Sequence, residues 1–491
     1  MSRSTGPLKG RRVQHQKFGT GEIIEIRRGG REYLVNFDNS ALRMWLLASE
    51  TVLIDTIGLD DSTEVIEVGE GLASLFSDTD KQSFTSRGGS KKNSPLKSAR
   101  KMIEAFRLGI VPLEEIDKFT FCREKEKSFL FNALNSISRD GGIIRMVLGE
   151  YGTGKSHFLE YFKHLALKDG WVVATTEFDQ LEIRPQNPKS VYHALLLSLV
   201  ARKEKNNKNI MTLLKEAIVD PDIYQKIYES KHPYITKLFE IIRHSKGYND
   251  KILWQWFTGD QINIPYVREY CDEKKLPSFL PYYSTAPIVC SILSSLGLIF
   301  KMMGYKGLLL LFDESESIST ISHYYKDKAD NFIKGLKLTA LGTERSFLKN
   351  ENLAHPTVGM DTNYIFEEHS YLALVFAMTP RPEDSATIFE ELITTEWQIE
   401  LNQIERESFL DLFKKLIEIH SAAYKYKHSL SELQKKEILT YLFDKKEERF
   451  PTTRLMIKFI IEILDLLKYH PNKPISVLLN EEDDFPFLEI E

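Results

Sequence analysis

The stretch GEYGTGKS, residues 149–156, is a glycine followed by four residues and then by Gly-Lys-Ser. An apolar run, 143–148, precedes it, and an apolar-periodic segment, 157–167, follows it. This pattern predicts a strand, a loop and a helix in succession. In such a loop the backbone N–H groups curl around a phosphate chain, and the positive end of the following helix points at it. The stretch therefore predicts a nucleotide-binding P-loop.

The residues of this loop are expected to contribute differently to nucleotide binding. Lys155 should reach the β- and γ-phosphates, and the Ser156 hydroxyl should ligate Mg²⁺. ATP and Mg²⁺ are thus the predicted cofactors. The predicted nucleotide-binding residues are Gly149, Glu150, Tyr151, Gly152, Thr153, Gly154, Lys155, Ser156 and His157.

A second phosphate-site signal is the apolar segment 308–312, which is followed by Asp313 and Glu314. Consecutive apolar residues suit a strand in the centre of a parallel sheet. Ligands of such sheets bind at the C-terminal ends of strands, so these carboxylates should lie beside the P-loop. Asp313 is predicted to hold the Mg²⁺ shell, and Glu314 to activate the attacking water. Glu316 is expected to face away from the site.

The order of these motifs is similar to that of AAA+ ATPases. That resemblance implies a polar residue, sensor 1, at the tip of the strand beside the Asp-Glu pair, and Thr379 after the apolar segment 372–378 fits this position. It also implies a lid helix that presents an arginine, sensor 2, to the γ-phosphate. Thr452 or Thr453 can cap a helix there, which places Arg454 in its first turn.

Two weaker assignments follow from the same resemblance. Arg381 is the one arginine between the predicted strand 372–378 and Trp397, so it is the candidate arginine finger that acts on a neighbouring subunit. A lead-in segment before the P-loop strand packs over adenine in AAA+ proteins, which makes Phe119, Phe121 and Arg123 candidate base-pocket residues. Ordinary packing is the alternative for the three base-pocket candidates, and a plain surface arginine is the alternative for Arg381 and for Arg454.

Composition limits the class of protein. The chain has 491 residues, of which 42% are hydrophobic, enough for a large core. Its formal net charge of −5 gives no global attraction to nucleic acid or membranes. Cys122, Cys271 and Cys290 have the spacing of neither a zinc site nor a disulfide framework. Without a signal-peptide pattern or a membrane-length apolar stretch, we expect a cytoplasmic protein.

The predicted fold class is α/β, with a small all-β domain in front. Alternating residues in 1–55 predict a small SH3- or Tudor-like barrel, and 56–97 has the composition of a flexible linker. Residues 98–400 are predicted to form a P-loop AAA+ core, a parallel sheet flanked by helices with a helical insertion at about 190–303. Residues 401–491 are predicted to form a helical lid.

Two resemblances to known families add to this prediction. Val13, His15, FGTG at 18–21 and VNFD at 35–38 resemble the Tudor-like domain of UvrD/PcrA-type helicases, which serves protein docking and nucleic-acid contacts. The rest of the chain resembles the BrxD-like ATP-binding proteins of BREX phage-defence systems. The segments that carry this second resemblance are RKMIEAFRLGIVP at 100–112, Arg123-Glu124, GEYGTGKSHFLEYF at 149–162, GYKGLLLLFDESESI at 304–318 and FPTTRLMIKFIIEILDLL at 450–467.

The BREX resemblance implies an ATPase that works with helicase or methyltransferase partners on foreign DNA. The first hypothesis is therefore an ATP-hydrolysing switch or motor that forms a homo-oligomer promoted by ATP. Its predicted catalytic residues are Glu314, Lys155, Thr379 and Arg454. The alternative is an ATP-gated scaffold with negligible turnover that docks partners through its N-terminal module. A compact P-loop kinase is a third interpretation, which the long insertion and the helical lid disfavour.

Overall fold

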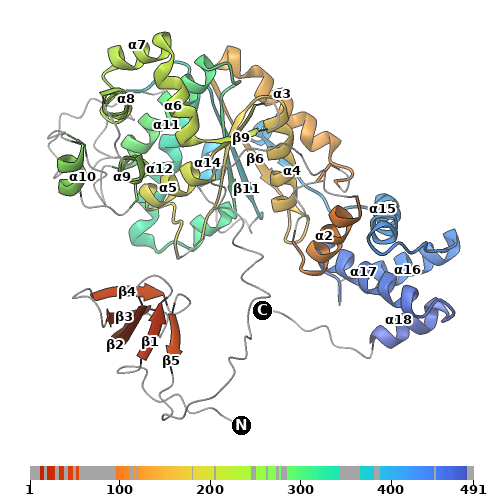
Figure 1. The fold of residues 1–491 in the computed structure, drawn as a ribbon. Coiled ribbons are helices and arrows are strands. Elements are labelled where there is room, and N and C mark those ends of the chain that lie inside the picture. The colour runs from red at the N-terminus through yellow and green to blue at the C-terminus, as the bar shows by residue number, and fades with distance from the viewer. Residues whose placement is uncertain are drawn as a thin grey trace, which may run out of the picture. The chain divides into compact units, whose positions relative to one another are not determined.

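The computed structural model divides the chain into two compact units, residues Met1–Ser90 and Lys91–Glu491 (Figure 1). Within the described residues, no helix is long and apolar enough to cross a membrane. The structure describes residues 12–15, 19–27, 32–37, 43–47, 51–54, 95–110, 116–117, 120–179, 181–203, 206–244, 250–260, 264–271, 276–277, 285–342, 365–380, 388–446 and 449–483.

The first unit contains a five-stranded antiparallel sheet with the strand order β4-β3-β2-β1-β5. Ile23 and Val35 lie opposite each other on neighbouring strands, and both are fully buried. The strands lie where alternation predicts them, whereas a Tudor-like barrel stays a prediction. Their bounds are β1 (Arg12–His15), β2 (Gly19–Arg27), β3 (Glu32–Phe37), β4 (Arg43–Leu47) and β5 (Thr51–Ile54).

The second unit is built around a seven-stranded sheet with the order β12-β6-β11-β10-β7-β8-β9. The five strands from β12 to β7 are parallel, and β8 and β9 extend one edge in antiparallel pairing. The predicted parallel sheet is thus confirmed. The bounds are β6 (Gly142–Leu148), β7 (Val172–Glu177), β8 (Val200–Lys203), β9 (Asn206–Asn209), β10 (Leu308–Asp313), β11 (Leu372–Met378) and β12 (Gln398–Glu400).

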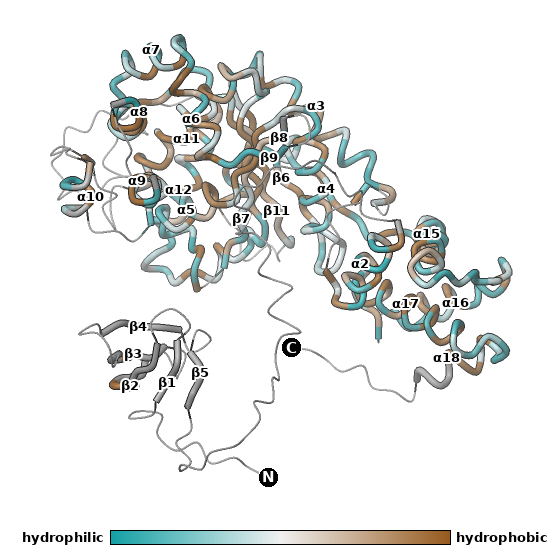
Figure 2. Tube along the Cα trace, in the orientation of Figure 1, coloured by the Kyte–Doolittle hydropathy of each residue, from teal (hydrophilic) through white to brown (hydrophobic). Residues whose placement is uncertain are grey.

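Helices cover both faces of this sheet, and its strands are rich in apolar residues (Figure 2). Strands that are buried on both faces need apolar side chains on both. In β10, Leu308, Leu310 and Phe312 belong to one hydrophobic core, and Leu309 and Leu311 belong to the other. The first core contains α5 (Pro188–Ser198), α11 (Thr285–Met302), α12 (His323–Leu341) and α14 (Ile388–Leu392), and the second contains α3 (Glu124–Asp140) and α4 (Lys155–Lys168).

The predicted insertion is mainly helical, with one difference. Strands β8 and β9 form a hairpin inside it, which helical periodicity did not predict because their residues are largely polar. Trp254 and Trp256 are both buried in the insertion and pack in its core. The insertion helices are α6 (Ile210–Val219), α7 (Pro221–Ser230), α8 (Ile235–His244), α9 (Asp250–Phe257) and α10 (Ile264–Tyr270).

Helix α2 (Pro95–Arg107) is the first helix of this unit in sequence, and it packs against the C-terminal helices (Figure 1). Arg107 of α2 donates to the Asp465 carboxylate at 2.6 Å and to the Tyr424 hydroxyl at 2.9 Å. The sequence placed 98–107 in the ATPase core, but its packing partners are the predicted lid. These partners are α15 (Arg406–Tyr424) and α17 (Thr453–Tyr469), and the other helices of the predicted lid are α16 (Glu432–Asp444) and α18 (Ile475–Asp483).

Candidate nucleotide-binding site

The P-loop connects the end of β6 at Leu148 to the start of α4 at Lys155, as predicted. Gly152 has φ +83° and Gly154 has φ +92°, values that only glycine adopts at low cost. Gly154 is the N-cap of α4 and has no side chain that could cap the first turn. The amides of that turn are therefore left for a ligand, as an anion site at a helix N-terminus requires.

The other loop residues divide into buried anchors and exposed side chains. The Thr153 side chain is buried and its hydroxyl donates to the Glu150 carbonyl at 2.8 Å, which closes the turn. Glu150, Tyr151 and Ser156 are exposed, Tyr151 by 78%. The exposed Ser156 hydroxyl on the first turn of α4 is accessible to a metal ion that arrives with a nucleotide.

Lys155 joins two predicted site residues. Its side chain is buried, and its Nζ donates to the Gly149 carbonyl at 3.0 Å and to Thr379 Oγ1 at 2.9 Å. Thr379 follows directly on β11, which lies between the P-loop strand β6 and the Asp-Glu strand β10. The parallel arrangement therefore brings the ends of three strands to one place, although they are far apart in sequence.

Asp313 and Glu314 follow the buried part of β10 at the same edge of the sheet. Asp313 lies opposite Glu177 of β7, and its Oδ1 accepts from the Glu314 amide at 3.0 Å. Glu314 has φ +50°, a left-handed conformation that is costly for a residue with a side chain. Burial, followed by the neighbouring Glu316 and Asp313 carboxylates, raises the pKa of Glu314 to about 7. A bound Mg²⁺ would act in the opposite direction, because it favours the charged carboxylate.

Glu316 does not face away from the site, contrary to the sequence-based expectation. Its Oε1 accepts a hydrogen bond from Thr379 Oγ1 at 2.5 Å. The physical reason is that β10 ends at Asp313 and the 3₁₀ helix η4 (Ser315–Thr320) begins one residue after the left-handed Glu314. The alternation of a strand does not continue through this turn, so position alone did not show where Glu316 points.

The N-terminus of α17 contacts the P-loop. Thr452 caps the helix by accepting from the Leu455 amide at 3.3 Å, and a Cβ added to Gly152 would lie 2.7 Å from Thr452 Cγ2. Arg454 is exposed in the first turn of α17, where its side chain lies against Gly109. The helix cap thus agrees with the predicted Thr452, and the γ-phosphate contact of Arg454 stays a prediction. Arg381 lies outside the described residues.

Comparison with known proteins places this site in a family. The family model described as BREX system ATP-binding protein BrxC/D matches residues 95–232 and 287–483, more than half of the chain. The chain belongs to the BrxC/D family. It is therefore an ATP-binding protein of a BREX phage-defence system, and other components of that system are its implied partners. The matched segments contain the P-loop, the Asp313-Glu314 pair and α17.

Among curated proteins, none matches the sequence of this BrxC/D-family chain. Among solved structures, it is similar to a Walker-type ATPase of Pyrococcus abyssi, with 10% sequence identity, a TM-score of 0.31, and coverage of 73% of this chain and 69% of that chain.

Arg123 of the BrxC/D-family chain is hydrogen-bonded to the backbone of the P-loop. Its guanidinium donates to the Thr153 carbonyl at 2.9 Å, to the Asn402 carbonyl at 2.9 Å and to the Glu126 carboxylate at 3.3 Å. The arginine is buried, and desolvation lowers its pKa. Sequence reasoning missed this clamp because Thr153 and Asn402 are distant in the chain.

The structure describes two of the three candidate base-pocket residues, Phe121 and Arg123. Phe119 lies outside the described residues, and Phe121 is half-buried against the core that contains α3 and α4. The neighbouring Thr120 hydroxyl donates to the Ile116 carbonyl and contacts His157 Nε2 at 2.9 Å. Burial, with the Arg123 charge second, lowers the pKa of His157 to about 4. The base-pocket role of these residues stays a prediction.

Replacing Arg123 by alanine should loosen the P-loop. Two carbonyls lose their donor and Glu126 loses its buried partner, so we expect a cost of about 2–4 kcal/mol in stability. The apparent affinity for ATP should also fall about tenfold, because the loop backbone that cradles phosphate is no longer fixed. Thermal unfolding and nucleotide titration measure the two effects. Arg139→Ala, at an exposed arginine on α3, is the matched control, and equal results for both variants would contradict the clamp.

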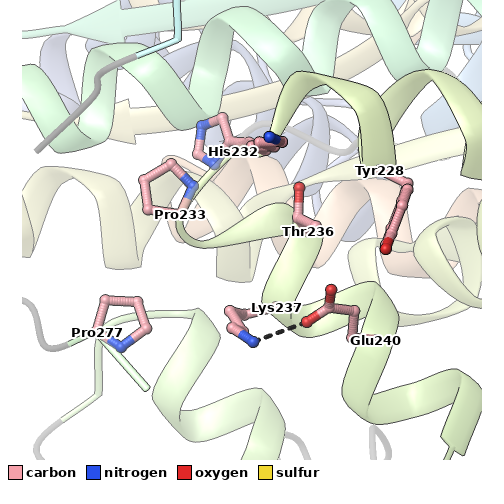
Figure 3. Close-up of a pocket in the computed structure, with 8 residues that line it drawn as sticks. Tyr228, His232, Pro233, Thr236, Lys237, Glu240 and Pro277 are labelled. Atoms are coloured by element: carbon pink, nitrogen blue, oxygen red, sulfur yellow. Dashed lines mark hydrogen bonds and ion pairs between the residues drawn. The ribbon is translucent and has the colours of Figure 1, made fainter. Parts of the chain in front are cut away.

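A separate cavity of about 400 Å³ is lined by residues of α7, of α8 and of the turn between them, and by Pro277 (Figure 3). Lys237 and Glu240 on its wall form an ion pair of 2.8 Å. The buried His232 ring accepts from the Tyr234 amide and contacts Ser291 Oγ at 3.0 Å. These polar groups serve protein contacts, and the cavity contains none of the residues predicted for nucleotide binding.

Proposed function

We propose that this BREX protein hydrolyses ATP as an AAA+ switch or motor. The observation that supports hydrolysis best is the contact of Lys155 with Thr379, beside Asp313, Glu314 and Glu316. A P-loop lysine, a polar residue on the central strand end and a group of carboxylates thereby meet at one edge of the sheet. A site that only bound a magnesium–nucleotide complex would need the loop and Asp313 but not a second carboxylate to accept a proton from water.

The residues fit a magnesium–nucleotide complex. The uncapped first turn of α4 and the curled loop around Gly152 and Gly154 suit a phosphate chain, and Ser156 and Asp313 offer oxygen ligands for Mg²⁺. Mg²⁺ would neutralise charge that develops on the phosphate oxygens. Asp313 is half-buried, which suits a carboxylate that holds an ion through its hydration shell.

The remaining residues can be assigned complementary roles. Glu314 is proposed as the base that accepts a proton from the attacking water, and its raised basicity suits that role. Lys155 is proposed to leave Thr379 and to contact the β- and γ-phosphates when ATP binds. Arg454 is proposed as sensor 2, because the helix that bears it touches the P-loop through Thr452.

The proposal also includes a homo-oligomer and partners. If Arg381 acts as an arginine finger on a neighbouring subunit, an ATP-promoted homo-oligomer follows. ATP hydrolysis is proposed to drive work on DNA together with a helicase or methyltransferase of the same defence system. The predicted domain division, with 98–400 as core and 401–491 as lid, is part of this proposal.

An ATP-gated scaffold is the second candidate. The observation that favours it is the separate compact unit Met1–Ser90, which is suited to docking a partner while the ATPase unit changes state. In that case nucleotide binding would control docking, and turnover would be negligible.

ATPase assays across a range of protein concentrations should separate the two candidates. We expect turnover per molecule to rise with concentration and ATP to increase the measured mass, because the proposed arginine finger Arg381 acts on a neighbouring subunit. Parallel reactions with double- and single-stranded DNA test whether DNA stimulates turnover. A monomer that binds ATP without turning it over at any concentration would instead support the scaffold.

A further inference from the structure

The hydrogen bonds around Thr379 have a fixed direction. The Lys155 ammonium can only donate, and a Glu316 carboxylate can only accept. Thr379 has a single hydroxyl proton, so this proton goes to Glu316 Oε1 at 2.5 Å, and a lone pair of the same oxygen accepts from Lys155 Nζ at 2.9 Å. Glu316 thus makes Thr379 a hydrogen-bond acceptor toward the nucleotide site.

This direction decides between the two contacts expected of a sensor residue. The oxygens of a γ-phosphate are acceptors, so an acceptor hydroxyl gains nothing from them and is repelled by their charge. An attacking water, in contrast, has two protons to donate. A threonine whose proton is committed to Glu316 is therefore suited to orienting the water.

The surroundings of Glu316 support a role in addition to packing. Its second oxygen, Oε2, is buried and has no hydrogen-bond partner among the described residues. A carboxylate oxygen is costly to hold in this state. A small apolar residue would avoid this cost, so packing alone does not explain the carboxylate.

We propose that Glu316 is a positioning residue that fixes the Thr379 hydroxyl as an acceptor. In the nucleotide-free site this acceptor holds the Lys155 ammonium. Once Lys155 contacts phosphate, the same lone pair is available to the attacking water, which Glu314 deprotonates. The inference rests on the proposed ATPase function and adds to it the regulation of Thr379 by Glu316.

A double-mutant cycle on ATP turnover tests this role. We expect Glu316→Ala to lower kcat about 10- to 100-fold while KM for ATP changes less than about threefold, because only the alignment of water is lost. Thr379→Val should have a similar effect. The double variant should be no slower than the worse single variant, since Glu316 acts through Thr379.

Two further variants separate positioning from structural damage. Glu316→Gln keeps an oxygen that can accept from Thr379, so it should recover at least about tenfold of the turnover lost in Glu316→Ala. Glu390→Ala, at an exposed carboxylate on α14, is the matched control and should retain wild-type turnover. Thermal unfolding of each variant shows that it is folded.

The outcomes distinguish this inference from the proposed function. Suppose that the wild-type protein is active but the losses of kcat in the two single variants multiply in the double variant, or that Glu316→Ala changes only KM. Either result would overturn the role of Glu316 and leave the proposed ATPase function standing. Wild-type protein that binds ATP without turnover would overturn the proposed ATPase and this inference with it. Non-additive losses in kcat, with partial recovery in Glu316→Gln, would support both.

Discussion

Glu314→Gln is expected to bind ATP with nearly wild-type affinity and to hydrolyse it at least a hundredfold more slowly. Glutamine has the shape of glutamate but cannot accept a proton from water, and removal of a general base costs about 10²–10⁴ in rate. The left-handed backbone at Glu314 should be tolerated equally by both side chains. Single-turnover hydrolysis and nucleotide titration provide the two measurements.

The control for this variant is the neighbouring carboxylate Glu177. It lies opposite Asp313 at the end of β7, and its side chain is exposed. Glu177→Gln should lose far less activity, because no role in proton transfer is assigned to it. Wild-type turnover in Glu314→Gln would move the search for the base to Glu316, which is the next carboxylate in the site.

The C-terminal helices and the P-loop are coupled through two independent contacts. Thr452 at the start of α17 touches Gly152, and Asn402, which precedes α15, shares Arg123 with Thr153. Any rotation of the C-terminal helices must therefore change the packing of the loop that binds phosphate. A contact of this kind is what the proposed lid requires in order to respond to the nucleotide state of the loop.

Local patterns predicted the parts of this site that depend on local sequence. The apolar residues 308–312 require a strand that is buried on both faces, and GEYGTGKS requires a strand, a loop and a helix. The observed strand order then places β11 between β6 and β10, which brings Thr379 to Lys155. These structural predictions are confirmed because the apolar runs and the glycines determine the elements directly.

The contacts that the sequence did not predict are long-range or depend on irregular backbone. The packing of α2 on α15 and α17 joins Arg107 to Asp465, and periodicity shows that a helix has an apolar face without showing what covers it. Glu316 reaches Thr379 only because Glu314 is left-handed and a 3₁₀ turn follows. Arg123 is a candidate base-pocket residue with ordinary packing as the alternative, and the contacts it makes are with the Glu126 carboxylate and with two backbone carbonyls that carry no sequence signal.

Lys155→Ala is expected to have the largest effect on the whole cycle. The ammonium is the one cation shown within hydrogen-bond distance of both the loop carbonyl of Gly149 and Thr379 among the described residues. Its loss removes a charged donor to phosphate, worth about 2–4 kcal/mol, so the affinity for ATP should fall more than about tenfold. Turnover should fall at least about a hundredfold, because the same charge stabilises the transition state.

Folding should survive this substitution, which keeps the experiment interpretable. Alanine leaves Thr379 bonded to Glu316, and Gly149 loses one donor to a carbonyl that water can reach once the side chain is gone. Lys163→Ala on the same helix, where the lysine pairs with Glu160, is the matched control and should retain both affinity and turnover. If Lys155→Ala hydrolysed ATP at the wild-type rate, the phosphate site would have to lie elsewhere, and the convergence of Lys155, Thr379 and Glu316 would then be purely structural.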